Sequence, residues 1–449
     1  MSDLLSIGLS GLSAYRSALS AVGDNVSNAE TPGYARRSVR LGEAASGGSG
    51  AIGEGEGVSF SGVKATAVLR AWDDFKAADA RLSASVAGRA NTRMQWLTAV
   101  ESALSETSGG VGSLASNFFN SLVTLAASPN DVLARSATLA ALDEATAAIR
   151  NAGDALARVA DGIGTAAQLE VDGLNTDLSA LADVNKAIRQ AEPGRSSHAS
   201  LADERDRLID SISARIDVST AIGDDGTVTL TLGGDTAISL LDRTTRALIS
   251  VAPAADGRLA LQLRANGVAS PLAASGGSLA GLVGVSASTA DQRVEFDAMA
   301  AQFVTSVNAW SAQGRDKNGN PGAPLLGITA GAVTVSMLTS DPAAIAAASA
   351  TGVDNGNLLD LTSLRDGTGF ESRWAGLVAA HSQVLSAARS EAAAASTRRD
   401  NSFAARDETA GIDLDREAAD LIRYQQAYSA SAKIIQTARD TVQSILDLF

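Results

Sequence analysis

The stretch "LLSIGLSGLSAYRSALSAVGDNVSNAETPGYARR", residues 4–37, contains one long helical pattern followed by an abrupt break. Its apolar or small residues recur at spacings that alternate between three and four, as in a helix that packs along one heptad seam. These residues are Leu5, Gly8, Leu12, Tyr15, Leu19, Val22, Val26 and Ala29. The pattern predicts a long N-terminal helix with an apolar stripe that needs a partner.

The break is the segment Thr31-Pro32-Gly33-Tyr34. Proline disfavours helical geometry at the residue before it, and glycine accepts the positive φ that a type II turn requires. We therefore expect the helix to end there and the chain to change direction. Arg36, Arg37 and Arg40 follow, and they either pair with carboxylates of an adjacent chain or lie on an exposed connector.

The C-terminal segment repeats the alternating spacing and has no Gly or Pro after Gly411. Two seam positions, Gln425 and Arg439, are polar and leave room for contacts with neighbouring chains. Either each terminal helix docks on its own chain, or the two helices pair and contact other subunits. For the second case, the predicted coiled-coil and subunit-interface residues are Leu5, Leu12, Tyr15, Leu19, Val22, Val26, Leu414, Leu421, Tyr428, Ile435, Val442, Leu446 and Phe449.

Both ends resemble the signatures of the bacterial flagellar rod, hook and hook-associated proteins. The N-terminal signature turn corresponds to Asn28, Thr31, Pro32, Gly33 and Tyr34, while Asp24 departs from the usual pair of asparagines. The C-terminal stretch "DLDREAADLIRYQQAYSASAKIIQTARDTVQSILDLF", residues 413–449, carries the Gln-Gln-Ala-Tyr and Ala-Lys-x-Ile-Gln-Thr elements. The two signatures occur in the order that the superfamily has.

Internal stretches are similar to one family within this superfamily, flagellar hook-associated protein 1, which is the first hook–filament junction protein. They are "SNFFNSLVTLAASPNDVLARSATL" (116–139), "LADERDRLIDSISARIDVS" (201–219), "DGTVTLTLGG" (225–234) and "FDAMAAQFVTSVNAWSAQGRDKNGNPGAPLL" (296–326). The resemblance implies homo-oligomerisation into a ring or helical layer. It also implies contacts with the hook protein, with a second hook-associated junction protein, and with a flagellar export chaperone through the C-terminal helix.

Composition excludes several classes of site. A formal charge of -14 leaves no excess of cations for nucleic acid or an anionic membrane, and no apolar run approaches the ~18 residues of a membrane span. The chain has no cysteine, and its two histidines, His198 and His381, lack metal-ligand spacing. The charged run at 203–207 is interpreted as a solvated helix face. We expect no enzyme activity, catalytic residue, metal site, cofactor or nucleic-acid partner.

The N-terminus lacks the charged start and apolar run of a cleaved secretory signal. The residues alone thus indicate a cytoplasmic protein or one exported without a cleaved signal. The resemblance implies the flagellar type III export route and a final position in the extracellular flagellum.

The predicted fold is mainly α with a β-rich insertion: paired terminal coiled-coil helices, an elongated helical body and a small outer β domain. Residues 1–41 with 412–449 are expected to form the inner coiled-coil domain, 42–217 with 287–411 the body, and 218–286 the β-rich domain. The Gly-rich stretch 42–57 is expected to be a flexible connector, and 314–370 leaves room for a small subdomain. Ser128-Pro129-Asn130 is expected to end one helix and cap the next, and a further helix is expected over 201–216. Strand-like stretches lie at 228–232, 247–251 and 259–263, and helices resume at Ser288.

These observations favour a self-assembling structural subunit at the hook–filament junction. One alternative is a flagellar rod or hook subunit, which shares the terminal signatures but not the internal segments. Another is a secreted adhesin or enzyme with axial termini, whose β-rich insertion would carry the activity.

Overall fold

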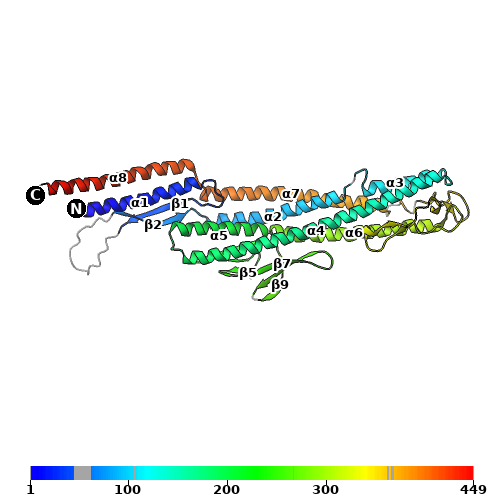
Figure 1. Cartoon of the computed structure of the whole chain (residues 1–449), viewed down its shortest axis with the longest axis horizontal. Helices are drawn as coiled ribbons and strands as arrows, with labels where there is room; N and C mark the ends of the chain where they lie inside the picture. The colour runs from blue at the N-terminus through cyan, green and yellow to red at the C-terminus, as the bar shows by residue number, and fades with distance from the viewer. Residues whose placement is uncertain are drawn as a thin grey trace. The chain divides into compact units, whose positions relative to one another are not determined.

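The structure, a computed structural model, describes residues 2–44, 62–105, 107–265, 267–361, 364–365 and 369–447. It is mainly α with a β-containing region and long terminal helices, which confirms the predicted fold class (Figure 1). The α-helices are α1 (Ser2–Ser27), α2 (Asp74–Ala103), α3 (Val111–Ala126), α4 (Val132–Gln190), α5 (Ser196–Arg215), α6 (Gly277–Gln313), α7 (Phe370–Ala410) and α8 (Leu414–Leu446). Short 3-10 helices are η1 (Ala332–Thr334) and η2 (Pro342–Ala344). None of the described helices combines the length and apolar content needed to cross a membrane.

The strands form small antiparallel sheets. One hairpin consists of β1 (Arg37–Glu43) and β2 (Val63–Arg70), with a register shift between Arg40 and Leu41. A four-stranded sheet has the order β3 (Val218–Ile222), β4 (Val228–Leu232), β5 (Asp235–Asp242), β6 (Thr245–Arg246). A three-stranded sheet has the order β7 (Leu248–Pro253), β8 (Leu259–Ala265), β9 (Val268–Leu272). Two-residue strands pair as β10 (Gly314–Arg315) with β13 (Ala348–Ser349), and β11 (Leu326–Gly327) with β12 (Ser336–Met337).

The chain divides into two compact units. Unit 1 comprises residues 1–86, 174–248 and 396–449, and unit 2 comprises 87–173 and 249–395. The boundaries fall inside α2, α4, β7 and α7, so each of these elements contributes residues to both units. The predicted division into three domains differs from these units and stays a prediction.

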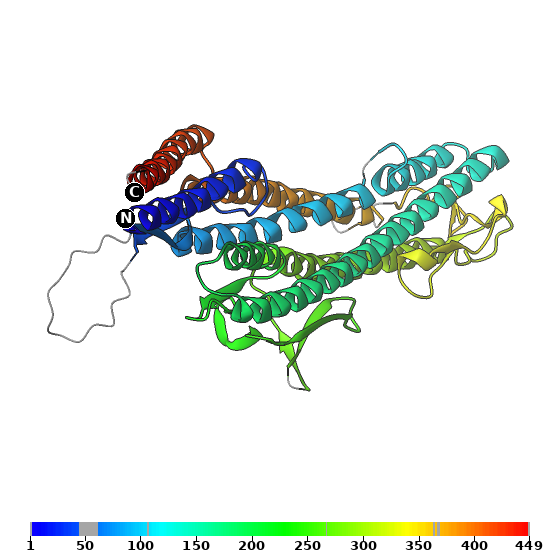
Figure 2. The same cartoon turned by 60° about the vertical axis from the view of Figure 1, so that its left-hand side comes forward.

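Unit 1 contains both terminal helices. Helices α1 and α8 lie side by side, and the hairpin β1–β2 lies against α1 (Figures 1 and 2). Helix α5 and the four-stranded sheet belong to the same unit. This unit therefore brings together the two ends of the chain, which the sequence signatures single out.

Unit 2 has a large core with an aromatic centre. The rings of Phe303 and Phe370 have centroids 4.9 Å apart, and Phe118 and Phe119 both meet Phe303 edge-on. Elsewhere in the unit, α2 and α7 pack through alanines, including Ala90. Five of the nine phenylalanines of the chain thus lie in the main core of unit 2.

The periodic segments are found where the sequence predicts them. Helices α3 and α4 end and begin on either side of Ser128-Pro129-Asn130, α5 covers the predicted helix over 201–216, and β4, β7 and β8 correspond to the predicted strands. One boundary is wrong, because α6 begins at Gly277 rather than at Ser288. Leu279, Leu282 and Val285 already bury one helical face there, which the glycines around them obscure in the sequence.

The Gly-rich connector is only partly described. Gly42 and Glu43 lie in β1, opposite Lys64 and Val63, so the predicted irregular segment does not begin at residue 42. Antiparallel pairing accounts for this because it satisfies their backbone groups. Residues 45–57 of the predicted connector lie outside the described residues. Apolar residues of the segment at 314–370, such as Leu325, Ile345 and Leu358, pack into the main core of unit 2.

Candidate assembly interface at the terminal helices

Helices α1 and α8 run antiparallel and meet through small side chains. A Cβ atom added at Gly8 would lie 2.5 Å from Cγ1 of Ile435, and one at Gly11 would lie 2.6 Å from Oγ of Ser431. Such close approach is possible only because these glycines lack a side chain. The buried stripe consists of Gly8, Gly11, Ala14, Ala18, Ala21, Val22 and Asn25 on α1, with Glu417, Ser431 and Ala438 on α8.

The large residues of the predicted seam flank this stripe. Half-buried members are Leu5, Leu12, Tyr15, Leu19, Leu421, Ile435 and Val442. Val22 is buried, whereas Val26, Leu414, Tyr428 and Leu446 are exposed, and Phe449 lies outside the described residues. The structure thus brings the two helices together, as one of the two sequence alternatives has it, but it leaves much of the large apolar surface uncovered. A role for these residues in contacts between subunits stays a prediction.

The signature turn has the geometry that its residues predict. Helix α1 ends at Ser27, the backbone N–H of Tyr34 donates to the carbonyl of Thr31 (3.2 Å), and Gly33 has a φ of +78°. Proline at the second position and a positive φ at the third are the marks of a type II turn. Asn28 accepts a hydrogen bond on Oδ1 from the hydroxyl of Thr31 (3.2 Å), which holds the end of the helix to the turn.

A buried polar network joins the turn, α1 and α8. The side chain of Asn25, which is 0% exposed, donates from Nδ2 to Oε2 of Glu417 (2.9 Å) and to the carbonyl of Arg37 (2.8 Å). Its Oδ1 accepts from the N–H of Arg37 (2.9 Å) and from the hydroxyl of Tyr34 (3.1 Å). All four hydrogen-bonding positions of this amide are therefore occupied. Glu417, also 0% exposed, accepts on Oε1 from Nε of Arg36 (2.6 Å).

Tyr34 acts in this network as a neutral donor. The pKa of its phenol is raised to about 12, mainly by burial, while the charge of Arg37 opposes the rise and the carboxylates of Asp24, Asp203 and Glu417 add to it. The guanidinium of Arg37 also stacks over the Tyr34 ring at 4.6 Å. The hydroxyl proton therefore stays on the tyrosine and remains available to Asn25.

A second network, here called the carboxylate ladder, crosses unit 1 along α5. Acids at spacings of three and four place their carboxylates on one helical face, and arginines from β1, β2, α2 and α7 bridge them. Successive members are joined by N–O distances of 2.6 to 3.2 Å. In order, the ladder consists of Arg37, Asp203, Arg70, Asp206, Arg81, Asp210 and Arg406.

The ladder corrects two interpretations of the sequence. The charged run at 203–207 is not a solvated face, because Asp203, Arg205 and Asp206 are buried and only Glu204 and Arg207 form an exposed pair. Arg36 and Arg37 likewise pair with carboxylates of their own chain, while Arg40 is exposed. The acids at 203, 206 and 210 share one helical face, which was the available signal that they point inward.

An open cleft of about 670 Å³ lies beside the signature turn in unit 1. One wall is the turn from Thr31 to Tyr34, and the other walls include Trp72, Arg207 and the chain around Gly411. All four residues from Thr31 to Tyr34 in the signature turn thus line this cleft.

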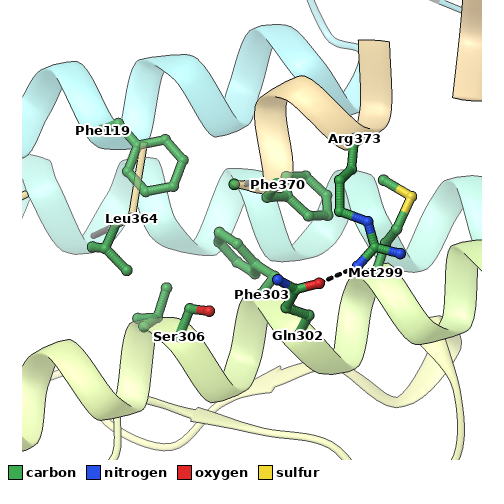
Figure 3. Close-up of a pocket in the computed structure, with 10 residues that line it drawn as sticks. Phe119, Met299, Gln302, Phe303, Ser306, Leu364, Phe370 and Arg373 are labelled. Atoms are coloured by element: carbon green, nitrogen blue, oxygen red, sulfur yellow. Dashed lines mark hydrogen bonds between the residues drawn. The ribbon is translucent and has the colours of Figure 1, made fainter. Parts of the chain in front are cut away.

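Unit 2 contains a small cavity of about 30 Å³ among the side chains shown in Figure 3. Its walls are mainly the apolar side chains of Phe119, Phe303 and Phe370, and Arg373 donates to Gln302 at its edge. The cavity therefore reflects aromatic packing. Within the described ranges, no three His, Asp or Glu side chains gather so that they could hold a metal ion.

Comparison with known proteins places these features in one family. The family model of the flagellar hook-associated protein FlgK helical domain matches residues 97–326, more than half of the 449 residues. The flagella basal body rod protein model matches residues 5–34. The model of the flagellar basal body rod FlgEFG protein C-terminal region matches residues 405–448. The first of these terminal matches covers most of α1 and the signature turn, and the second covers the end of α7 and the whole of α8.

Curated relatives and a solved structure agree. Flagellar hook-associated protein 1 of Bacillus subtilis is 28% identical over 490 residues, which cover 97% of this chain and 96% of that protein. The Escherichia coli protein of the same name is 24% identical over 73% of this chain and 60% of its own length. The flagellar hook junction protein FlgK from Burkholderia pseudomallei has the same fold, with a TM-score of 0.65 at 15% identity over 73% of this chain and 99% of that chain. The chain therefore belongs to the FlgK family of flagellar hook-associated proteins.

Proposed function

We propose that this chain is a structural subunit of the bacterial flagellum and forms the junction between hook and filament. The observation that carries the proposal is the FlgK helical-domain match over 97–326, flanked by rod-type matches at 5–34 and 405–448. A rod or hook subunit would share the terminal matches without the central one. As a structural subunit the chain needs no catalytic groups, and the absence of enzyme activity stays a prediction.

Self-assembly through the terminal helices would supply the mechanism. Large apolar side chains flank the stripe that joins α1 to α8, and Leu9, Ile422 and Leu446 are each more than half exposed. Each such side chain contributes ~1.5–3 kcal/mol when it is fully buried. Head-to-tail contacts between identical copies would bury them and generate a ring or a helical layer. Neighbouring subunits would then add to the stability of the α1–α8 pair.

The partners follow from this position. The hook protein would lie on one side of the layer and a second hook-associated junction protein on the other. Before assembly, a flagellar export chaperone would cover the apolar side chains of α8, and the chain would leave the cell by the flagellar type III route without a cleaved signal.

Truncation of residues 435–449 tests the chaperone contact. This change removes the end of α8, including the exposed Ile445 and Leu446. We expect co-purification of the chaperone to be lost, while the circular dichroism of the remaining helices is retained. Undiminished co-purification would place the chaperone site elsewhere on the chain.

Deletion of the gene tests the junction role. We expect electron microscopy to show complete hooks without filaments, and immunoblots to show flagellin lost to the medium. A plasmid copy of the intact chain should restore filaments. Missing hooks would move the protein to the rod or hook, and normal filaments would support the adhesin or enzyme alternative.

A further inference from the structure

Small residues form most of the contact between α1 and α8. The α1 side consists largely of glycine and alanine, and α8 meets it at Ser431, at Ala438 and at Ile435, whose side chain lies against Gly8. Because small residues recur at spacings of three and four, a shift of one helix by one turn along the other brings similar small residues into contact. A slide of one turn in one direction brings Ile435 opposite Gly11 in place of Gly8, so packing alone discriminates poorly between that register and the observed one.

One contact on this interface is polar and fully buried. Asn25 and Glu417 are both 0% exposed and are joined by a 2.9 Å hydrogen bond across the two helices. Each also holds the chain that follows the signature turn, since Asn25 binds the backbone of Arg37 and Glu417 binds Arg36. The position of α8 along α1 is thereby coupled to Arg36 and Arg37, which lie outside both helices.

A slide of α8 by four residues, about 6 Å along a helix, would break these bonds together. In one direction Leu421 would come opposite Asn25, and in the other Asp413, which precedes the helix, would do so. Buried amide and carboxylate groups without partners are strongly disfavoured, because they have left water without replacing its hydrogen bonds.

We propose that Asn25 and Glu417 fix the axial register of α8 on α1, as a buried polar pair does in other helix pairs. The register decides which α8 side chains face away from α1. Ile422 and Tyr428, for example, are exposed in the observed register. That these side chains meet neighbouring copies rests on the proposed function, whereas the register itself concerns a single chain.

Engineered cysteines report the register, because the chain has no cysteine of its own. A Cβ added at Gly11 would lie 3.2 Å from the Cβ of Ser431, somewhat less than the roughly 3.5–4.5 Å between the Cβ atoms of a disulfide, so a small separation of the helices accommodates the bridge. Gly11→Cys with Ser431→Cys therefore reports the observed register. Gly11→Cys with Ala427→Cys and Gly11→Cys with Ile435→Cys report slides of one turn in either direction. Intramolecular closure under mild oxidation is followed on non-reducing gels of the full chain.

We expect the observed-register pair to close at least about ten-fold faster than either shifted pair in the parent chain. In the double variant Asn25→Leu with Glu417→Leu, the preference should fall below about three-fold, because apolar groups of similar size fill the space without specifying a register. Asp420→Leu is the matched control, since it removes an α8 carboxylate that binds Arg36 (3.1 Å) and should leave the preference intact. Circular dichroism checks that the variants fold.

Two results would overturn the proposal: a preference that survives in the double variant, or equal closure of all three pairs in the parent. Glu417→Gln keeps an oxygen for the Asn25 amide and tests the proposal even if the double variant does not fold. Loss of the preference in Glu417→Gln would assign the register to the charge of Arg36 instead. Closure needs no second copy, so a negative result would leave the junction role intact, and failure of the gene-deletion test would leave the register measurement intact.

Discussion

Replacing Asp206 with alanine should destabilise unit 1 strongly. This carboxylate is 2% exposed and accepts hydrogen bonds from Nη2 of Arg70 (2.9 Å), Nη2 of Arg81 (3.2 Å) and Nε of Arg205 (3.2 Å). Without it, three guanidinium groups in the interior lose a shared counter-charge. Removing one partner from a buried ion pair typically costs about 3–5 kcal/mol, so we expect the free energy of unfolding to fall by that amount.

Glu204→Ala is the matched control on the same helix. Its carboxylate pairs with Arg207, but the two side chains are 38% and 57% exposed, and such pairs contribute about 0–1 kcal/mol. Urea unfolding followed by circular dichroism gives the overall change, and hydrogen exchange of the α5 amides reports the local free energy of opening. If Asp206→Ala and Glu204→Ala differ by less than about 1 kcal/mol in both assays, the carboxylate ladder does not stabilise unit 1 as argued.

Two further predictions concern other parts of the chain. Gly8→Val should reduce hydrogen-exchange protection of α8 by about 1–3 kcal/mol, because the new side chain would overlap Ile435. Gly23→Ala is the control and should be tolerated, since no atom lies within 4 Å of its added Cβ. Equal losses of protection in both variants would contradict the close helix contact. Burial lowers the pKa of His381 in the folded chain below its value in the unfolded chain. The neutral His381 ring therefore contributes fully to the free energy of unfolding above about pH 6.5, and this contribution is lost as the pH falls towards the folded pKa. The melting temperature of the parent should therefore drop more between pH 7 and pH 5 than that of His381→Gln, and identical drops would show that this ring does not titrate on unfolding.

Local chemistry explains why much of the fold could be predicted from the sequence. The signature turn could be predicted because Pro32 and Gly33 determine its backbone conformation locally. The same holds for the break at Ser128-Pro129-Asn130 and for the alternating strand at 228–232, which is buried on one face. In each case the residues that determine the structure lie next to one another in the chain.

The two polar networks could not be predicted because their partners are distant in sequence. Asn25 meets Glu417 across 392 residues, and Asp203 meets Arg37 across 166. Local spacing shows that Asp203 and Asp206 share a helical face, but it does not show which cations will come to them. Charged runs of this kind usually lie in solvent. The prediction of a solvated face was therefore wrong because tertiary contacts bury these side chains.

The helical seam illustrates a different limit. Heptad analysis gives weight to large residues such as Leu12 and Leu19, whereas α8 packs against the glycines and alanines beside them. A helix with one stripe of small residues and one stripe of large apolar residues can pack against two different partners. Sequence periodicity identifies both stripes but does not assign a partner to each.

The small-residue contact between α1 and α8 has a kinetic consequence for the proposed assembly. A helix pair joined by glycine, alanine and serine buries little apolar surface by itself, while leucines and isoleucines on its flanks remain exposed to solvent. Two free copies that meet in dilute solution would cover only part of each other's flanks, whereas an existing layer would present complementary flanks from several copies at once. Subunits of this kind would add to the tip of a growing structure far more readily than they would start a new one in the surrounding fluid.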